Sequence, residues 1–161
     1  MIVSKKKNNT IFAAEKTGIL VVDDHPIICD GLADLINHEV DLVVIAKAGT
    51  VAEAVKAVKK QLIDFAIVDM LLKNETGIQV TKKIKALCPD IVVLIFSMRD
   101  ELKYIKQAFE TGARGYITKD EISEKIVDAI RKIFKGQIYI SRGLLKNLPK
   151  VEVRNLLTGR A

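Results

Sequence analysis

The sequence has few of the residues that build disulfide scaffolds, aromatic clusters or membrane spans. Of its 161 residues two are cysteine, three are proline and none is tryptophan. Cys29 and Cys88 lack the spacing of metal ligands, so we expect reduced thiols and a cytoplasmic location. The longest apolar run, Ile91–Phe96, is far shorter than the roughly 18 residues that a membrane span needs. We therefore expect no membrane association.

The net charge of +6 is concentrated at the two ends of the chain. Residues 1–18 carry four lysines and one glutamate, and residues 136–161 carry five basic residues and one glutamate. The central part is close to neutral. Basic tails are usually solvated, so this charge is weak support for nucleic-acid binding by the central part.

Continuous apolar runs alternate with amphipathic stretches from residue 19 to residue 135. Unbroken apolarity is typical of strands that are covered on both faces, as in a parallel sheet. The apolar runs are 19–22, 42–46, 65–68, 91–96 and 116–117. Of the five helical patterns, the first begins at Pro26 and the second at the capping box Thr50–Glu53. The third stops before Pro89, and the fourth and fifth end at Gly112 and Gly136. Five strands alternating with five helices predict a doubly wound α/β fold with a five-stranded parallel sheet.

Polar residues follow the predicted strands where ligands collect in such folds, at the carboxyl ends. Asp23 and Asp24 follow the first strand, Asp69 the third, Ser97 the fourth and Lys119 the fifth. Three carboxylates in one pocket repel each other unless a cation neutralises them, and oxygen-only ligation favours Mg²⁺. A carboxylate can also attack phosphorus and form an aspartyl phosphate, whose charge Mg²⁺ and an ammonium would offset.

The same residues resemble the receiver domain of bacterial response regulators over residues 18–136. The segments "VVDDHPIICDGL", "FETGARGYITKDE" and "KGQIYIS" are similar to the NarL/FixJ subfamily, whose members carry a LuxR-type DNA-binding domain. The resemblance implies a flavodoxin-like sheet of strand order 2-1-3-4-5. It also implies that a sensor histidine kinase transfers a phosphoryl group to Asp69, and that the domain is no enzyme beyond its own phosphotransfer and dephosphorylation.

The resemblance assigns the remaining site residues position by position. Asp23, Asp24 and Asp69 would hold Mg²⁺, together with the backbone carbonyl of Leu71. Lys119 would contact the phosphoryl group. The Ser97 hydroxyl and the Tyr116 ring would be the switch residues, Tyr116 turning from exposed to buried on phosphorylation.

Some positions depart from the family or admit a plainer interpretation. In "DMLLKNETG" Lys73 stands where the family usually has proline, so we expect a looser loop from which Lys73 could reach the site. Leu71 and Arg99 occupy positions that affect phosphoryl lifetime in the family. Ser97 alone could be the N-cap of the fourth helix, and Tyr116 alone could be a core residue. His25 is expected to have no role as ligand or phosphoacceptor.

The ends suggest three segments: a basic N-terminal extension (1–17), a receiver domain (18–136) and a linker (137–161). The closing "LLTGRA" resembles the start of a LuxR-type helix-turn-helix, and too few residues follow Ser141 for such a domain. We expect a chain that stops before its output domain, so that DNA would be bound only through that absent domain. A natural stand-alone receiver that acts through protein contacts is the alternative.

The leading hypothesis is a two-component switch that controls transcription. Its expected partners are a sensor histidine kinase and a second copy, bound through the fourth helix, fifth strand and fifth helix or through the first and fifth helices. A haloacid-dehalogenase-type phosphatase would need an Asp-x-Asp motif and a cap domain, whereas this chain has adjacent acids. A binding module with a degenerate site is disfavoured by the complete set of acids, serine and lysine.

Overall fold

The computed structural model describes residues 15–159 of the chain. Most of the predicted N-terminal extension and the last two residues of "LLTGRA" lie outside this range. The strands are β1 (Thr17–Val22), β2 (Leu42–Ala48), β3 (Phe65–Asp69), β4 (Val92–Ser97), β5 (Gly115–Thr118) and β6 (Tyr139–Ile140). The helices are α1 (Pro26–Asn37), α2 (Val51–Lys60), α3 (Gly77–Leu87), α4 (Leu102–Glu110), α5 (Ile122–Phe134), α6 (Arg142–Asn147) and α7 (Lys150–Thr158).

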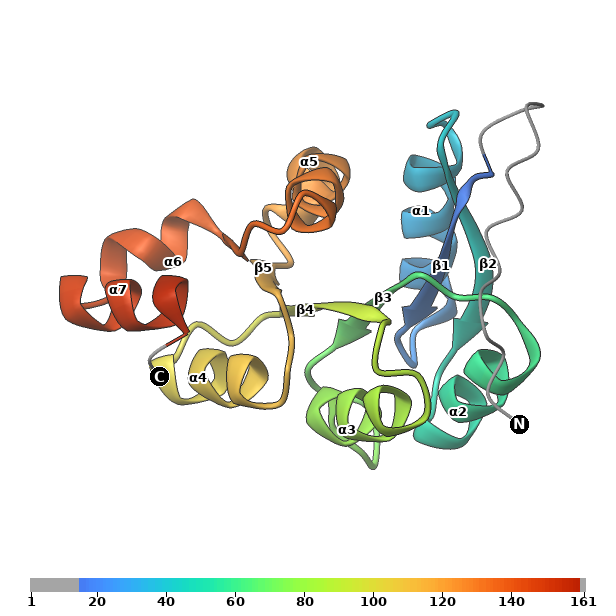
Figure 1. Ribbon diagram of the computed structural model, residues 1–161, viewed down its shortest axis with the longest axis horizontal. Helices are drawn as coiled ribbons and strands as arrows, with labels where there is room; N and C mark the ends of the chain where they lie inside the picture. Colours follow the sequence, from blue (N-terminus) through green and yellow to red (C-terminus); the bar gives the residue numbers. More distant parts are fainter. Residues whose placement is uncertain (1–14, 160–161) are drawn as a thin grey trace.

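One parallel sheet in the order β2-β1-β3-β4-β5-β6 runs through the molecule (Figure 1). The predicted doubly wound α/β fold and the order 2-1-3-4-5 are confirmed. Within residues 15–159 the count of five strands is corrected to six, because β6 pairs with β5 in the register Gly115 to Tyr139 and Tyr116 to Ile140. β6 has only two residues, which is too short to give a recognisable apolar run.

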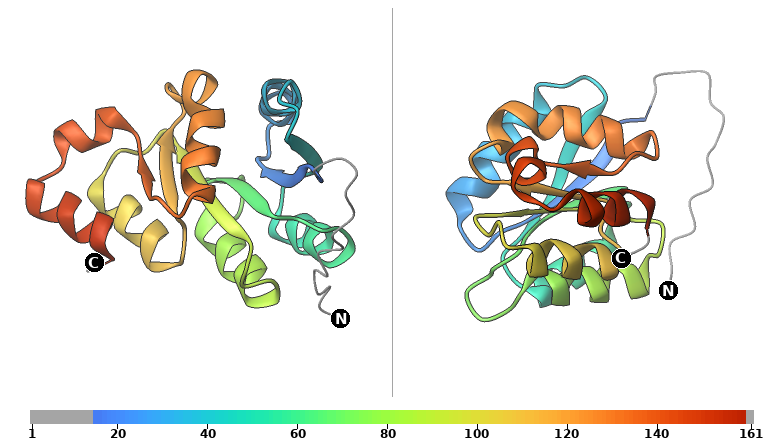
Figure 2. Two further views of the ribbon diagram at one scale, coloured as in Figure 1. Left: turned by 45° about the horizontal axis from the view of Figure 1, so that its top comes forward. Right: turned by 90° about the vertical axis from the view of Figure 1, so that its left-hand side faces the viewer.

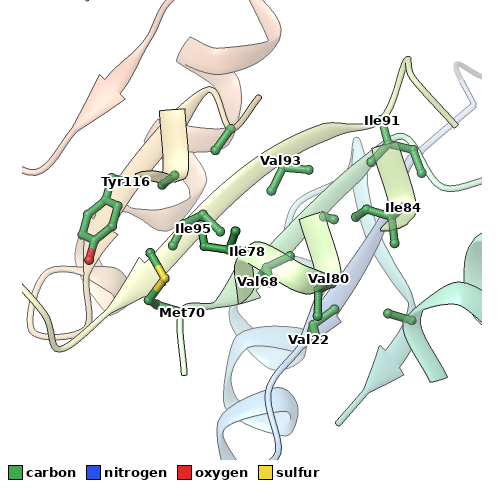
Figure 3. Packing of buried hydrophobic residues seen from close by; sticks show 14 of the residues in the cluster. Val22, Val68, Met70, Ile78, Val80, Ile84, Ile91, Val93, Ile95 and Tyr116 are labelled. Carbon is green, nitrogen blue, oxygen red and sulfur yellow. The ribbon is translucent and has the colours of Figure 1, made fainter. Parts of the chain in front are cut away.

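Helices cover both faces of the sheet (Figure 2). Successive strand residues point to opposite faces, and each set packs against its own group of helices. Side chains of α1 and α5 share one buried cluster with Ile19, Ile67 and Ile117. The other buried cluster joins α2, α3 and α4 to the alternate strand residues, among them Val68 and Ile95 (Figure 3). This double coverage explains why the strands are continuously apolar.

The segment that follows α5 folds against the α4 side of the sheet. Leu144 on α6 and Leu156 on α7 are 3% and 2% exposed and belong to the same cluster as Tyr116. The side chains of Lys106 on α4 and Glu152 on α7 form an ion pair of 3.0 Å. Figure 1 shows α6 and α7 beside α4. The described part of the predicted linker is therefore folded and packed.

Within residues 15–159, no helix has the length and apolarity to cross a membrane.

Candidate functional site

The polar residues that follow the strands meet at one edge of the sheet, as the sequence predicts. Asp23 follows β1, Asp69 ends β3 and Ser97 ends β4, and these side chains are almost completely buried. Lys119 follows β5, and its backbone N–H donates to the carbonyl of Ser97 at 3.0 Å. Parallel strands with this register bring their carboxyl ends together, which places four strand ends in one site.

Lys119 connects two of the buried carboxylates. Its Nζ lies 3.1 Å from Asp69 Oδ2 and 3.7 Å from Asp23 Oδ2. Burial raises the pKa of the Asp69 carboxyl, and the hydrogen bond and charge of Lys119 act in the opposite direction. One ammonium faces two buried carboxylates, with a third carboxylate on the neighbouring Asp24, so the pocket has an excess of negative charge.

The residues present fit a divalent cation. The Asp23 side chain has no solvent exposure, and its Oδ2 accepts no hydrogen bond from the described residues. Asp24 Oδ1 is likewise buried without a hydrogen bond from that part of the chain. A buried carboxylate oxygen that lacks a donor is costly unless a cation takes its place. Ligand atoms of Asp23, Asp24, His25 and Asp69 all lie within 4.8 Å of one another.

His25 is part of this cluster, whereas we expected it to have no role as a ligand. Its Nδ1 lies 2.9 Å from Asp23 Oδ1 and 3.1 Å from Asp24 Oδ1, although its side chain is 64% exposed. The pKa of His25 is raised, first by the hydrogen bond to Asp23 and then by the charge of Asp24. Its position directly after two acids was the signal in the sequence, but adjacency alone does not show where a ring points.

The loop after Asp69 is ordered by a short bridge between Leu71 and Thr76. The backbone N–H of Leu71 donates to Asp69 Oδ1 at 3.2 Å, which holds Leu71 beside the predicted phosphoacceptor. Gly77 begins α3 against this loop, where an added Cβ would collide with the backbone of Asp69 and Met70. The bridge orders the loop in which Lys73 stands where the family usually has proline. Lys73 lines a cavity of about 270 Å³ together with Asp24.

The two predicted switch residues are connected through the backbone of Arg99. The Arg99 N–H donates to Ser97 Oγ at 2.9 Å, and the Tyr116 hydroxyl donates to the Arg99 carbonyl at 2.7 Å. Tyr116 is already fully buried, on the same face of the sheet as Ile95 (Figure 3), and burial raises its pKa to about 12. The alternative that Ser97 caps the fourth helix is wrong, because the N-cap of α4 is Glu101.

The chain is similar to a known protein family and to known proteins. Residues 19–131 match the family described as the response regulator receiver domain. The chain is 33% identical over 131 residues to the transcriptional activator protein ExaE of Pseudomonas putida, and 31% identical over 138 residues to the oxygen regulatory protein NreC of Staphylococcus aureus. These matches cover 81% and 85% of this chain but only 61% and 64% of the relatives. The chain thus spans about three fifths of their length.

Solved structures of the same kind share the fold. A two-component response regulator of the LuxR family from Aurantimonas sp. SI85-9A1 has a TM-score of 0.77 and 31% identity, covering 82% of this chain and 94% of that one. The signal receiver domain of the response regulator NarL from Mycobacterium tuberculosis has a TM-score of 0.71 and 30% identity, covering 77% of this chain and 100% of that one.

Proposed function

The chain belongs to the response regulator receiver family, and on that premise we propose that it is a phosphoacceptor switch in which Asp69 takes a phosphoryl group from the phosphohistidine of a sensor kinase. The observation that carries the proposal is that Lys119 Nζ lies within 3.7 Å of carboxylate oxygens of both Asp69 and Asp23 at the end of the sheet. A structural role alone does not call for several buried carboxylates around one lysine.

The proposed reaction is a displacement at phosphorus. Asp69 is the nucleophile: a carboxylate oxygen forms the P–O bond as the P–N bond to the kinase imidazole breaks, and the imidazole leaves with the electron pair. Lys119 stabilises the negative charge on the transferred group. Asp23, Asp24, Asp69 and the carbonyl of Leu71 would hold Mg²⁺, which when bound neutralises charge on the phosphoryl oxygens. The activity is limited to the chain's own phosphorylation and dephosphorylation.

Ser97 and Tyr116 are proposed to convert this chemistry into a change of shape. A phosphoryl group on Asp69 would draw the hydroxyl of Ser97 toward it. The Arg99 N–H that now bonds to Ser97 would then shift, and with it the carbonyl that holds Tyr116. The two hydrogen bonds on one residue support a direct connection from the phosphorylation site to the α4 side of the sheet.

We propose that this α4 side controls assembly and output. α7 is bound to α4 through the Lys106–Glu152 ion pair, so this surface is partly occupied by the chain itself. Contact between two copies through α4, β5 and α5 would compete with α7 for the surface of α4, and contact through α1 and α5 is the alternative. Control of transcription, in the cytoplasm and through a DNA-binding domain, is proposed by analogy with relatives that are transcriptional regulators.

Acetyl phosphate with Mg²⁺ tests the phosphoacceptor role without the kinase. Intact mass spectrometry should show the addition of one phosphoryl group to the wild-type chain, and none to Asp69→Asn. The matched control is Asp90→Asn, which changes an exposed aspartate and should behave as wild type. A mass gain that persists in Asp69→Asn would move the nucleophile to another residue.

A further inference from the structure

His25 is positioned as if it were a ligand of the acidic site. Two ligands that bind one metal ion at about 2.1 Å and at right angles lie about 3 Å apart. The separations of His25 Nδ1 from Asp23 Oδ1 and Asp24 Oδ1 are 2.9 and 3.1 Å. Both distances are close to the separation of neighbouring ligands around an octahedral ion, and the shorter one is a hydrogen bond that an ion would replace.

The second, independent observation is the unpartnered oxygen of Asp23. Asp23 Oδ1 accepts hydrogen bonds from both the backbone N–H and the ring of His25, whereas Oδ2 has only the more distant Lys119 ammonium, 3.7 Å away. Oδ2 accepts no hydrogen bond from any described residue although the side chain is completely buried. Asp24 Oδ1 also accepts no hydrogen bond from the described residues, and it lies 3.1 Å from His25 Nδ1. The site therefore offers a buried oxygen without a hydrogen-bond donor at ligand spacing from the ring nitrogen.

An imidazole nitrogen among the ligands affects which divalent ion the site binds most strongly. Mg²⁺ prefers oxygen ligands and water, whereas imidazole favours the later first-row transition metals. A nitrogen ligand in place of an oxygen or water ligand therefore strengthens the binding of Co²⁺, Ni²⁺ and Zn²⁺ relative to Mg²⁺. His25 can supply that nitrogen from a side chain that is exposed enough to adjust its ring.

We propose that His25 is a nitrogen ligand that makes this site select first-row transition-metal ions over Mg²⁺. The inference deepens the proposed function, because it concerns the same acidic site, and it makes the cation that supports phosphorylation depend on which divalent ion is available. An ion bound at Nδ1 would replace the hydrogen bond from the ring to Asp23, and the ring proton would be released to water.

The test compares Co²⁺ with Mg²⁺ on the untagged chain by isothermal titration calorimetry. His25→Ala should lower the ratio of the Co²⁺ to the Mg²⁺ association constant by about tenfold or more. His38→Ala is the matched control, since His38 is the other histidine of the sequence and lies at the end of α1, and it should keep the wild-type ratio. An unchanged ratio in His25→Ala would overturn the proposal.

Pulsed electron paramagnetic resonance with Cu²⁺ as the probe detects an imidazole bound to the ion. A merely structural role of His25 would not change this signal. The remote nitrogen of a bound imidazole should modulate the signal in wild type and His38→Ala, and this modulation should be absent in His25→Ala. Its persistence in His25→Ala would also refute the proposal. If acetyl phosphate with Mg²⁺ fails to modify Asp69 of the wild-type chain, that result contradicts the proposed function. It does not bear on whether His25 is a metal ligand.

Discussion

Lys119 Nζ lies 3.1 Å from Asp69 Oδ2, although the two residues are 50 positions apart in the sequence. The contact exists because β4 lies between β3 and β5, and the strand ends therefore converge. Asp69 nevertheless keeps a raised pKa, since burial outweighs the lysine. The Asp69 carboxylate is therefore held in the site at a cost to the stability of the fold.

This cost predicts that Asp69→Asn stabilises the metal-free chain at neutral pH. A folded state with a raised pKa binds its proton more tightly than the unfolded chain, so stability falls as pH rises from the ordinary value of 3.8 through the raised value. The full cost is present at pH 7. We expect a melting temperature about 2–4 °C higher for Asp69→Asn, the shift that about 1 kcal/mol produces in a chain of this size.

Thermal unfolding at pH 7 and near pH 4, with a chelator present, measures this effect. The difference between wild type and Asp69→Asn should shrink toward the acidic pH, because the folded carboxyl then takes up its proton and the cost of burying its charge falls away. Asp90→Asn should show no comparable rise in melting temperature at pH 7. A lower melting temperature for Asp69→Asn at pH 7 would contradict the prediction.

Mg²⁺ is expected to stabilise the chain through the unpartnered carboxylate oxygens. A ligand present at ten times its dissociation constant adds about 1.4 kcal/mol to the free energy of unfolding. Asp24→Asn should lose most of this gain, since it removes one of the charged ligands. Differential scanning calorimetry with MgCl₂ and with a chelator would show it. Equal gains in Asp24→Asn and wild type would place the ion elsewhere.

Ser141 ties the C-terminal segment to the strand that carries the site. Its backbone N–H donates to the Tyr116 carbonyl, and its Oγ accepts the N–H of Thr118 at 2.9 Å. Ser141 is fully buried, so Ser141→Ala leaves the Thr118 N–H without its acceptor and should cost about 1–3 kcal/mol. Hydrogen exchange of the Thr118 amide should accelerate. The exposed Ser123→Ala is the control, and equal exchange in both variants would show that the bond is unimportant.

The sequence predicted the elements with strong patterns and missed those that depend on a few atoms. Thr50 was predicted as a helix cap, and its hydroxyl does accept the N–H of Glu53. The Glu53 carboxylate, however, bonds to Gly49, and the complete capping box is formed by Thr76 and Gln79 instead. α7 was not expected, because its packing on α4 depends on tertiary contacts that a local pattern does not contain.

The candidate site was predictable as a set of strand ends but not as a network. Parallel strands require their carboxyl ends to share an edge, so the convergence of Asp23, Asp69 and Lys119 follows from topology. The direction of the His25 ring and the backbone bonds of Arg99 do not, since no periodicity reports a ring rotamer or a loop carbonyl. The hydrogen bonds of Arg99 to Ser97 and Tyr116 depend on the tertiary structure of the loop.

The Arg99 connection makes a specific prediction for Ser97. Ser97→Ala removes the acceptor of the Arg99 N–H and the hydroxyl that a phosphoryl group would attract, so a signal at Asp69 should no longer reach the loop that holds Tyr116. Moving a two-state population from 1:99 to 99:1 takes about 5.5 kcal/mol of differential binding, which a few charge-assisted hydrogen bonds can supply. Loss of one of them should leave the switch mostly in its resting state.

Beryllofluoride with Mg²⁺, as a mimic of the phosphoryl group, tests this prediction directly. In wild type it should change hydrogen exchange at residues 97–101 and the sedimentation coefficient at high protein concentration. Ser97→Ala should reduce both responses, whereas Ser123→Ala, an exposed serine on α5, should keep them. Tyr116→Phe lacks the hydroxyl that bonds to Arg99 and should fall between wild type and Ser97→Ala, because the ring remains buried while the connection is cut at its far end. Full responses in Ser97→Ala would mean that the loop moves without this serine, and the route from Asp69 to α4 would have to run through Lys119 and β5.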